Sequence, residues 1–279
     1  MPLERTSIAA RPLSAIHPTA VVSPQAVIAA DVRIGPYTVV EGPVSIEAGS
    51  EIGPHVHLVG PLVIGPRNRI GTGTVIGTDP QHLGYRGEPT RTEIGEANTF
   101  REHVTVHRGS HVEGVTRIGS RNYFMSHSHV AHDCKVANDC ILANGALMGG
   151  HCELQDRVFL SGNTAVHQFV RMGRLSLLVG LEGVSRDVPP FMTVKNRSAI
   201  LGINRVGMRR AGMSSADIAA VRKACHILYR TDLVLKDALT RLQAELGSHA
   251  LVAEILQFAR ESKRGIMRSV RSGSDADEE

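Results

Sequence analysis

Histidine, aspartate and cysteine are concentrated between residues 126 and 136, where the sequence reads SHSHVAHDCKV. Three histidines, one aspartate and one cysteine fall within this short segment. An imidazole titrates near neutral pH and can also bind a transition metal, and an adjacent carboxylate can orient it. His132 and Asp133 are therefore a candidate proton-transfer pair, and the segment as a whole is a candidate metal site.

A six-residue repeat runs through most of the chain. Steps of six from Ile16 to Val184 visit 29 positions, of which 27 are apolar, whereas chance would give about twelve. The two polar exceptions are His82 and Glu88. Because a period of six fits a short strand followed by a tight turn, and fits neither a helix nor simple alternation, it predicts a parallel β-solenoid.

This repeat resembles that of the hexapeptide-repeat acyltransferases, whose fold is a left-handed parallel β-helix with three hexads in each triangular coil. The resemblance implies that residues 18 apart stack in adjacent coils, so that residues 16 to 189 would form about ten coils. Pro189 and Pro190 are expected to end the strands. We therefore expect a β-helix domain over residues 1–189.

Helical periodicity begins at Ser214, which forms a capping-box-like start with Asp217. Two further helices are expected over about 232–246, closed by Gly247, and about 249–264. The sequence thus predicts a C-terminal α-helical domain over residues 190–271 and a disordered acidic tail over 272–279.

Stacking of each coil on the next predicts which side chains are neighbours. It places His132 beside Gly150, and Gly149 beside His167. A proton-transfer site needs a base, an orienting carboxylate and a backbone donor close to the reacting atom, and His132, Asp133 and Gly150 supply these three types. The same spacing makes Cys134, Cys140 and Cys152 inward-facing thiols rather than metal ligands.

Several motifs together resemble the UDP-N-acetylglucosamine O-acyltransferase family, over about Ile16 to Arg268. The motifs are HVAHDC, LMGGH, AVHQF, VTVHRG, GEPTRTEIG, RDVPPF and GINRVGMRRAG. The resemblance implies transfer of a (3-hydroxy)acyl chain from acyl carrier protein to the 3-hydroxyl of UDP-N-acetylglucosamine, the first step of lipid A biosynthesis. No cofactor and no metal are implied.

The resemblance also implies a role for each site residue. His132 would be the general base, Asp133 would orient its imidazole, and the Gly150 amide would stabilise the oxyanion. Gly180 would form the floor of the acyl groove. Substrate contacts are implied for Gln81, His82, His107, His129, His151, His167, Gln168, Asn204 and Arg210.

Two residues depart from the family pattern. The family loop reads close to PQDLKY, whereas this chain has PQHLGY, so that His82 replaces a sugar-contacting carboxylate and Gly84 replaces a lysine. A carboxylate only accepts hydrogen bonds from sugar hydroxyls, while a neutral histidine can also donate. A paralogous acyltransferase with a different nucleotide-sugar acceptor, such as a diamino sugar, is therefore an alternative.

Two further enzyme classes share the scaffold. A zinc enzyme resembling the γ-type carbonic anhydrases, which share histidine ligands between subunits, would use His127, His129 and His132 as ligands. The N-acyltransferase that acts two steps later in the same pathway carries an additional N-terminal uridine-binding domain, and this chain enters the repeat by Ile16.

Composition and charge limit the location and the partners. No apolar segment is long enough for a membrane span or a secretory signal, so we expect a cytoplasmic protein. The net charge of +4 favours an acidic partner, and basic residues 205, 209, 210, 222 and 223 are a candidate docking surface for acyl carrier protein. Nucleic acid binding is not expected. The resemblance implies a homotrimer with active sites between subunits.

Overall fold

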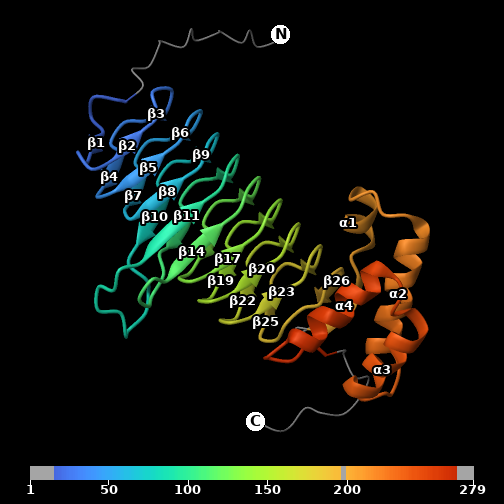
Figure 1. Cartoon of the computed structure of the whole chain (residues 1–279). Helices are drawn as coiled ribbons and strands as arrows, with labels where there is room; N and C mark the ends of the chain where they lie inside the picture. The colour runs from blue at the N-terminus through green and yellow to red at the C-terminus, as the bar shows by residue number, and fades with distance from the viewer. Residues whose placement is uncertain (1–15, 196–198, 269–279) are drawn as a thin grey trace, which may run out of the picture.

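The chain folds into a triangular β-prism with a group of helices at its C-terminal end (Figure 1). The structure is a computed structural model that describes residues 16–195 and 199–268. The predicted acidic tail and the part of the predicted β-helix domain before Ile16 lie outside the described residues. Within the described part, each strand along the chain belongs to the next of three sheets in a repeating order. Nearly all neighbouring strands within a sheet run parallel.

We name each sheet by its first strand. The β1 sheet contains β1 (Val21–Val22), β4 (Val39–Glu41), β7 (His57–Val59), β10 (Val75–Thr78), β13 (Thr105–His107), β16 (His129–Val130), β19 (Leu147–Met148), β22 (Ala165–Val166) and β25 (Gly183–Val184). The β2 sheet contains β2 (Val27–Ile28), β5 (Val44–Ile46), β8 (Leu62–Ile64), β11 (Arg91–Ile94), β14 (Val115–Ile118), β17 (Lys135–Val136), β20 (Glu153–Leu154) and β23 (Arg171–Met172). The β3 sheet contains β3 (Arg33–Ile34), β6 (Glu51–Ile52), β9 (Arg69–Ile70), β12 (Thr99–Phe100), β15 (Tyr123–Phe124), β18 (Ile141–Leu142), β21 (Phe159–Leu160), β24 (Leu177–Leu178), β26 (Met192–Lys195) and β27 (Ala199–Ile203).

The predicted apolar residue of each hexad fills the inside of the prism. Leu58, Ile76, Phe124 and Leu160 are completely buried, as are many small fifth-position residues of the hexad such as Thr74. The predicted inward-facing thiols of residues 134, 140 and 152 are buried and unpaired, which confirms that interpretation. The core is thus a stack of aliphatic layers, which accounts for a sequence with few aromatics.

Two insertions interrupt the regular stacking, in which paired residues such as Val21 and Val39 are 18 apart in sequence. Val75 of β10 pairs with Thr105 of β13, a sequence offset of 30, and Thr105 pairs with His129 of β16, an offset of 24. Together the insertions use one coil's length of chain, so the β1 sheet has nine strands over the described residues instead of the expected ten coils. Both offsets are multiples of six, which is why the repeat looks continuous: Val112 matches it but lies in a loop and is 64% exposed.

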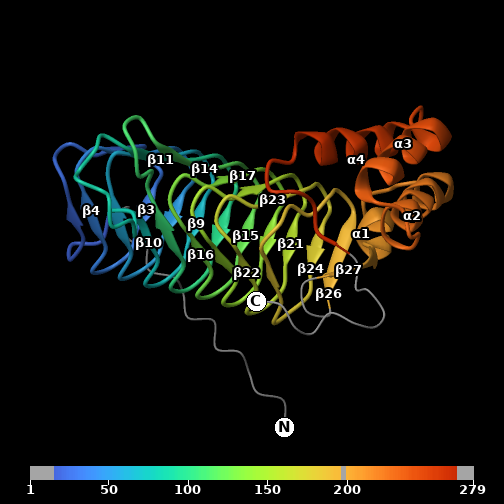
Figure 2. The same cartoon turned by 90° about the horizontal axis from the view of Figure 1, so that it is seen from below.

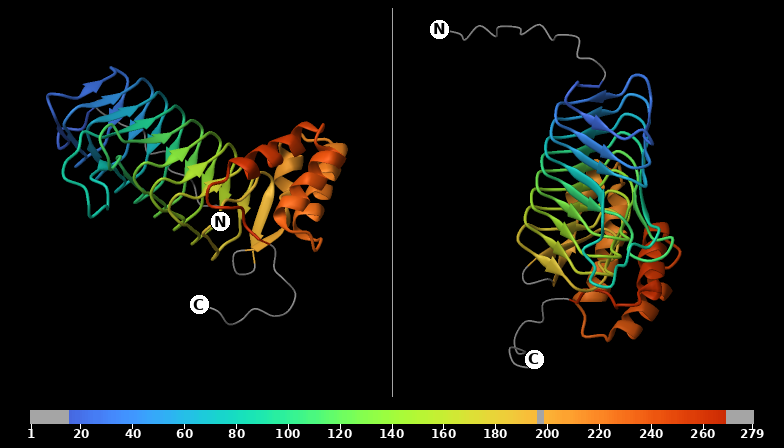
Figure 3. Two further views of the ribbon diagram at one scale, coloured as in Figure 1. Left: turned by 60° about the horizontal axis from the view of Figure 1, so that its bottom comes forward. Right: turned by 90° about the vertical axis from the view of Figure 1, so that its left-hand side faces the viewer.

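The two inserted loops, residues 79–90 and 108–114, leave the prism at the same corner, between the β1 and β2 sheets. The first projects from the side of the prism (Figures 1 and 3). Most regular corners contain a residue with positive φ, and none of the described non-glycine residues in this conformation is β-branched. Asp133, His151 and Phe169 occupy these positions in three successive coils, with φ of 60°, 59° and 66°.

The strands do not end at Pro189 and Pro190, contrary to the prediction from the sequence. Val188 bridges to Met172 of β23, and β26 pairs with β24, so the β-helix continues for most of another coil. The prolines lie in the turn between these pairings, where the missing N–H removes no ladder hydrogen bond. The final strand, β27, is antiparallel to β26, and the hexad repeat gives no signal for it.

Four helices follow β27 in the described residues: α1 (Arg205–Arg210), α2 (Ser215–Tyr229), α3 (Leu235–Leu246) and α4 (Ala250–Glu261). The predicted capping box of Ser214 and Asp217 is present at α2, and α3 ends at Gly247 as expected. Helix α4 lies beside the last coils (Figure 2), where Glu254 pairs with Arg174 at 2.7 Å. None of the helices in the described ranges is long and apolar enough to span a membrane.

Candidate active site

The site lies on the corner between the β1 and β2 sheets, which we call the histidine corner and define as residues 131–134, 149–152 and 167–170. Its coils are joined by backbone hydrogen bonds from His151 N to His132 O at 3.0 Å and from Phe169 N to Gly150 O at 2.9 Å. The expected stacking of residue 132 on residue 150 is therefore correct, because no insertion separates these two coils.

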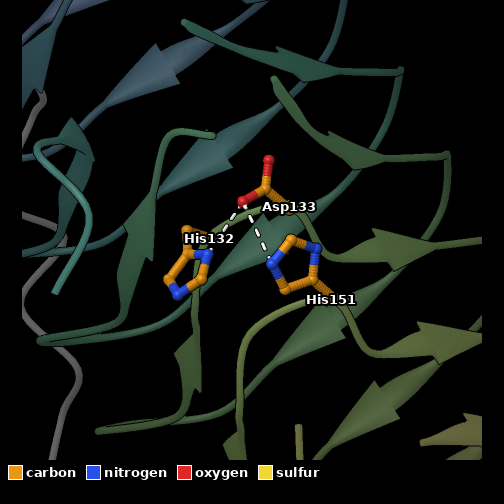
Figure 4. A group of neighbouring side chains, drawn as sticks. All are labelled: His132, Asp133 and His151. Atoms are coloured by element: carbon orange, nitrogen blue, oxygen red, sulfur yellow. Dashed lines mark hydrogen bonds and ion pairs between the residues drawn. The ribbon is translucent and has the colours of Figure 1, made fainter. Parts of the chain in front are cut away.

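Asp133 is fixed by several hydrogen bonds. Its Oδ2 accepts from His132 Nδ1 at 2.8 Å and from the backbone N and Oγ of Ser110 at 3.0 and 2.7 Å. His151 Nε2 lies 3.7 Å from the same oxygen (Figure 4), and His111 Nδ1 lies 3.2 Å from Oδ1. Burial disfavours the charged carboxylate, but the His132 and Ser110 hydrogen bonds and the two nearby imidazoles outweigh it and lower the pKa of Asp133 to about 2.

This pKa makes a prediction about acid stability. A carboxylate whose pKa is lower in the folded chain than in the unfolded chain stabilises the fold above the unfolded pKa, and this contribution is lost as the pH falls through the folded value. The unfolding free energy of wild type should therefore decrease relative to that of Asp133→Asn between about pH 4 and pH 2. Chemical denaturation at each pH measures the difference; parallel curves would contradict it. Asn tolerates the positive φ at this position as well as Asp does.

The His132 imidazole lies directly over Gly150. With Nδ1 donating to the Asp133 carboxylate, Nε2 is left as the acceptor nitrogen. A Cβ built on Gly150 would lie 2.7 Å from Nε2 and 2.5 Å from Cε1, so only glycine fits beneath the ring. Gly150 is buried, and its N–H has no hydrogen-bond acceptor among the residues that the structure describes. A buried N–H without a partner is rare, and here it lies beside a candidate base.

Three more predicted histidines surround this pair. His151 packs edge-on against His132, with ring centroids 5.1 Å apart, and His107 packs edge-on against His129 at 4.9 Å. Burial, with a smaller contribution from His107 and His132, lowers the pKa of His129 to about 4, and its Nδ1 bonds to Thr105 Oγ1 at 2.7 Å. Burial also lowers the pKa values of His107 and His151. At pH 7 these three rings are therefore neutral, so they can act as hydrogen-bonding groups without adding charge.

The inserted loop 79–90 brings His82 to the same place. The His82 ring meets the His132 ring edge-on, with centroids 5.4 Å apart. Gln81, its neighbour in the loop, is exposed. A Cβ on Gly84 would lie 2.8 Å from His82 Cε1, so the two departures from the family loop depend on each other: the imidazole occupies space that a side chain at 84 would need.

The remaining predicted residues do not all reach the histidine corner within one chain. His167 and Gln168 lie on it, exposed, with His167 Nδ1 3.4 Å from Arg264 Nη2. Asn204 lies at the corner between the β2 and β3 sheets, where its Nδ2 donates to Leu175 O at 2.9 Å and its Oδ1 caps α1; Arg210 is at the end of α1. Gly180 lies at the third corner, between the β3 and β1 sheets.

The zinc-ligand set of a carbonic-anhydrase-like enzyme is not assembled. His127 lies on the corner between the β3 and β1 sheets, His129 is in β16, and His132 follows on the histidine corner. The described residues contain no metal-ligand group made of these three side chains. A single coil places them on different sides of the prism, so they cannot bind one ion in this chain.

Comparisons with known proteins agree with this architecture. Residues 187–267 match a family described as UDP-N-acetylglucosamine O-acyltransferase, domain 2. A relative from Anaeromyxobacter sp. (strain Fw109-5) named acyl-[acyl-carrier-protein]–UDP-N-acetylglucosamine O-acyltransferase is 46% identical over 91% of this chain and 100% of its own length. The chain belongs to the UDP-N-acetylglucosamine O-acyltransferase family. A relative of the same name from Myxococcus xanthus is 45% identical over 92% of this chain and 100% of its own.

Solved structures of family members share the fold. The UDP-N-acetylglucosamine acyltransferase of Francisella novicida aligns with a TM-score of 0.89 at 34% identity, covering 91% of this chain and 94% of that one. The enzyme of Bacteroides fragilis aligns with a TM-score of 0.88 at 36% identity, covering 90% and 99%. The predicted left-handed parallel β-helix with a C-terminal helical part is thereby confirmed, and the chain is an acyltransferase.

Ser110 and His111 of this family member contact the Asp133 carboxylate, but the repeat does not predict either of them. They lie in the inserted loop 108–114, and stacking at the regular spacing cannot align them with Asp133 because β13 and β16 are offset by 24. The signal in the sequence is the pair of small residues Ser110 and Gly114 around Val112, which is typical of a solvent-facing turn rather than a strand. Arg264, beside His167, carries no sequence signal of its own.

Proposed function

We propose that this chain transfers an acyl group, such as a 3-hydroxyacyl chain, from acyl carrier protein to the 3-hydroxyl of UDP-N-acetylglucosamine, the first step of lipid A biosynthesis. The names of its relatives give the acyl donor, the nucleotide sugar and transfer to an oxygen. The observation that supports the chemistry best is the position of the His132 imidazole, which Asp133 holds over Gly150. Within the described residues, the N–H of Gly150 has no hydrogen-bond acceptor and is therefore free to bind an oxyanion.

The proposed reaction uses these groups in order. The sugar hydroxyl gives its proton to His132 Nε2 as its oxygen attacks the thioester carbonyl carbon. The Gly150 N–H donates to the oxyanion that forms, and Asp133, which remains ionised at neutral pH, stabilises the imidazolium through Nδ1. When the intermediate collapses, the C–S bond breaks and the imidazolium returns its proton to the thiolate of acyl carrier protein.

The surface of the prism supports a homotrimer. The outer face of the β2 sheet is charged and internally ion-paired, as in Lys135 with Glu153 at 3.0 Å. In the C-terminal half of the prism, exposed apolar side chains lie instead on the β3 sheet at Ile141, on the β1 sheet at Leu147, and at the corner between them at Leu181, which is 82% exposed. The exposed apolar residues of the β2 sheet, Val27 and Val63, lie in the N-terminal half. Neighbouring prisms would therefore face each other through the β1 and β3 sheets, with the charged sheet outward.

This arrangement would complete the site. Around a three-fold axis, the histidine corner of one protomer would face the neighbour's corner between the β2 and β3 sheets, where Asn204 and Arg210 lie. A pocket of about 390 Å³ there is lined in part by Asn204, Arg205 and Arg222. Its two guanidinium groups suit the diphosphate of the nucleotide sugar. The Asn204 side chain is partly used in capping α1, so we assign the phosphates to the arginines.

Subunit complementation tests the shared site. His132→Ala and Arg205→Ala should each be nearly inactive. A mixed trimer carries both intact residues at one of its three sites, so the purified mixed species should recover about a third of the wild-type activity, and an unfractionated equal mixture about a quarter. The two variants would be unfolded and refolded together or coexpressed with different tags, and transfer measured on the mixed species. If mixing restores nothing although mixed trimers form, His132 and Arg205 do not serve the same site across an interface.

The activity itself is tested with purified protein. Acyl carrier protein thioesters of several chain lengths would be incubated with UDP-N-acetylglucosamine and with its diamino-sugar analogue, and the acylated nucleotide quantified. Transfer to the hydroxyl of UDP-N-acetylglucosamine is expected. Exclusive transfer to the amine of the analogue would replace our proposal by the paralogous activity, and no transfer to either would reject it.

His82 and Gly84 make a separate prediction about the acceptor. Gly84→Ala should push the His82 ring from its position and raise the KM for the nucleotide sugar about fivefold to tenfold, the effect of one hydrogen bond, with little change in kcat. His82→Ala should do the same, and the double variant should be no worse than His82→Ala alone because Gly84 acts through His82. Additive effects would mean that the loop contributes by another route.

Acyl carrier protein is proposed to approach the basic surface around α1 and α2. Arg209 and Arg210 contribute cations there in addition to Arg205 and Arg222, which we assign to the phosphates, whereas Lys223 is paired with Glu245 at 2.7 Å and offers less. The cytoplasmic location and the role of Gly180 in limiting the acyl chain remain predictions from the sequence.

A further inference from the structure

Three potential metal-ligand atoms converge on the histidine corner (Figure 4). His132, Asp133 and His151 each offer one ligand atom, and these atoms all lie within 4.8 Å of one another. In the described part of the chain, no other group of three or more histidine, cysteine or acidic side chains converges in this way. Two imidazoles and one carboxylate are a donor set that zinc uses in catalytic sites, where a fourth position stays open.

The distances suit a small divalent ion. Zinc bonds nitrogen and oxygen at about 2.0–2.2 Å, so tetrahedral ligand atoms lie about 3.3–3.6 Å apart. Here His132 Nδ1 lies 2.8 Å and His151 Nε2 3.7 Å from Asp133 Oδ2, one below and one slightly above that range. The ligand atoms of His132 and His151 lie within 4.8 Å of each other, so the two imidazoles must move closer together by up to about 1 Å to form the site. All three residues come from two adjacent coils, so the scaffold already holds them together.

His111 is placed to be a fourth ligand. Its Nδ1 lies 3.2 Å from Asp133 Oδ1, and its side chain is 64% exposed on the inserted loop, so it can rotate without disturbing the core. A pocket of about 380 Å³ opens onto His111, Asp133 and His151, and gives an ion a path from solvent. The charged side chains that line this pocket are of both signs, among them Glu113, Glu153, Arg117 and Lys135.

We propose that His132, Asp133 and His151, assisted by His111, bind a divalent first-row transition metal such as Zn²⁺, and that the bound ion inhibits acyl transfer. The inhibition rests on the proposed function, since it concerns the base of that reaction. An ion on His132 Nδ1 displaces the proton that now bonds to Asp133. In a neutral imidazole that proton must then reside on Nε2, the atom that would accept the proton of the sugar hydroxyl.

The ion therefore blocks the base rather than the substrate pocket. It also occupies the carboxylate oxygen that orients the imidazole, so both parts of the proton-transfer pair are lost together. A metal-bound enzyme would be inactive until a chelator or a competing ligand removes the ion. This predicts inhibition that excess nucleotide sugar relieves poorly.

Metal titration of the full-length protein tests the site. Protein freed of metal with a chelator would be titrated with Zn²⁺ by calorimetry and with Co²⁺ by visible absorption, while acyl transfer is assayed in parallel. We expect one ion per chain, loss of transfer in proportion to occupancy, and recovery with EDTA. His151→Gln should abolish tight binding, and His111→Ala should weaken it about tenfold or more.

His226→Ala is the matched control, because His226 is an exposed histidine on α2, outside the histidine corner, and does not line the pocket with Arg205 and Arg222. It should leave both affinity and inhibition unchanged. The proposal is wrong if transfer persists with the ion fully bound, or if tight binding survives His151→Gln and His111→Ala. If metal-free wild type transfers no acyl group at all, the proposed function fails, while the Co²⁺ titration still decides whether the metal site exists.

Discussion

Replacing His132 by alanine is expected to reduce kcat for acyl transfer about 10²- to 10⁴-fold, the range for a general base. The side chain is held by Asp133 and presents Nε2 on the side of Gly150 where a Cβ would lie. The neutral rings of His107 and His129 lie nearby but cannot replace His132 as the base. In the part of the chain that the structure describes, neither ring is hydrogen-bonded to a carboxylate that could stabilise its protonated form. Steady-state kinetics at saturating nucleotide sugar, with circular dichroism to verify the fold, would measure the effect.

Two comparisons make this result interpretable. His226→Ala, which changes an exposed histidine on α2, should leave kcat unchanged. Asp133→Asn should keep the imidazole in place but lose the stabilisation of the imidazolium, so its loss should be large but smaller than that of His132→Ala. A His132→Ala enzyme that retains most of its kcat would remove His132 from the mechanism.

Gly150→Ala is expected to reduce kcat about 10²- to 10³-fold, the range for an oxyanion donor. The added methyl group would lie 2.5 Å from His132 Cε1 and 2.7 Å from Nε2, so the ring must move away from its present position. The variant would thus lose the correct placement of both the base and the amide, although the corner backbone stays compatible with alanine because Gly150 has no positive φ. Thermal unfolding should change little compared with kcat.

Gly202→Ala provides the matched control, since a Cβ built on Gly202 meets no atom within 4 Å. It should have nearly wild-type kinetics and stability. The Gly150 assignment fails if Gly150→Ala transfers acyl groups as fast as Gly202→Ala does. A variant of Gly150 that unfolds would be compared with the double variant that also carries His132→Ala, in which the steric conflict with the imidazole is absent and folding should recover.

The repeat predicted the scaffold well because it is a local property of the chain. Each hexad specifies its own strand and turn, and stacking copies of it needs no information from distant segments. Ile76 and Leu160 were therefore correctly assigned to the core. The same locality explains the capping box at α2, which needs only Ser214 and Asp217.

Where the repeat is interrupted, prediction became unreliable. The insertion before β14 shifts the register by one hexad, so Ser110 was not recognised as a partner of Asp133. The loop at 79–90 carries no periodicity, and only its folded path shows that His82 meets His132 while Gly84 leaves it room. Strands β26 and β27 were missed because the two prolines before them suggested an end to the sheet.

The sequence by itself determined the parallel β-solenoid and the helices after residue 214, because these depend on short-range patterns repeated at a fixed spacing. The stacking of His132 on Gly150 also needed the three-hexad coil that the family resemblance implies. Only the tertiary structure decided that the two loops meet at one corner and that Asn204 and Gly180 lie on the other two. Those positions depend on how far each insertion shifts the winding of the chain around the prism. No residue carries that information alone, since it is set by the sum of the preceding coils.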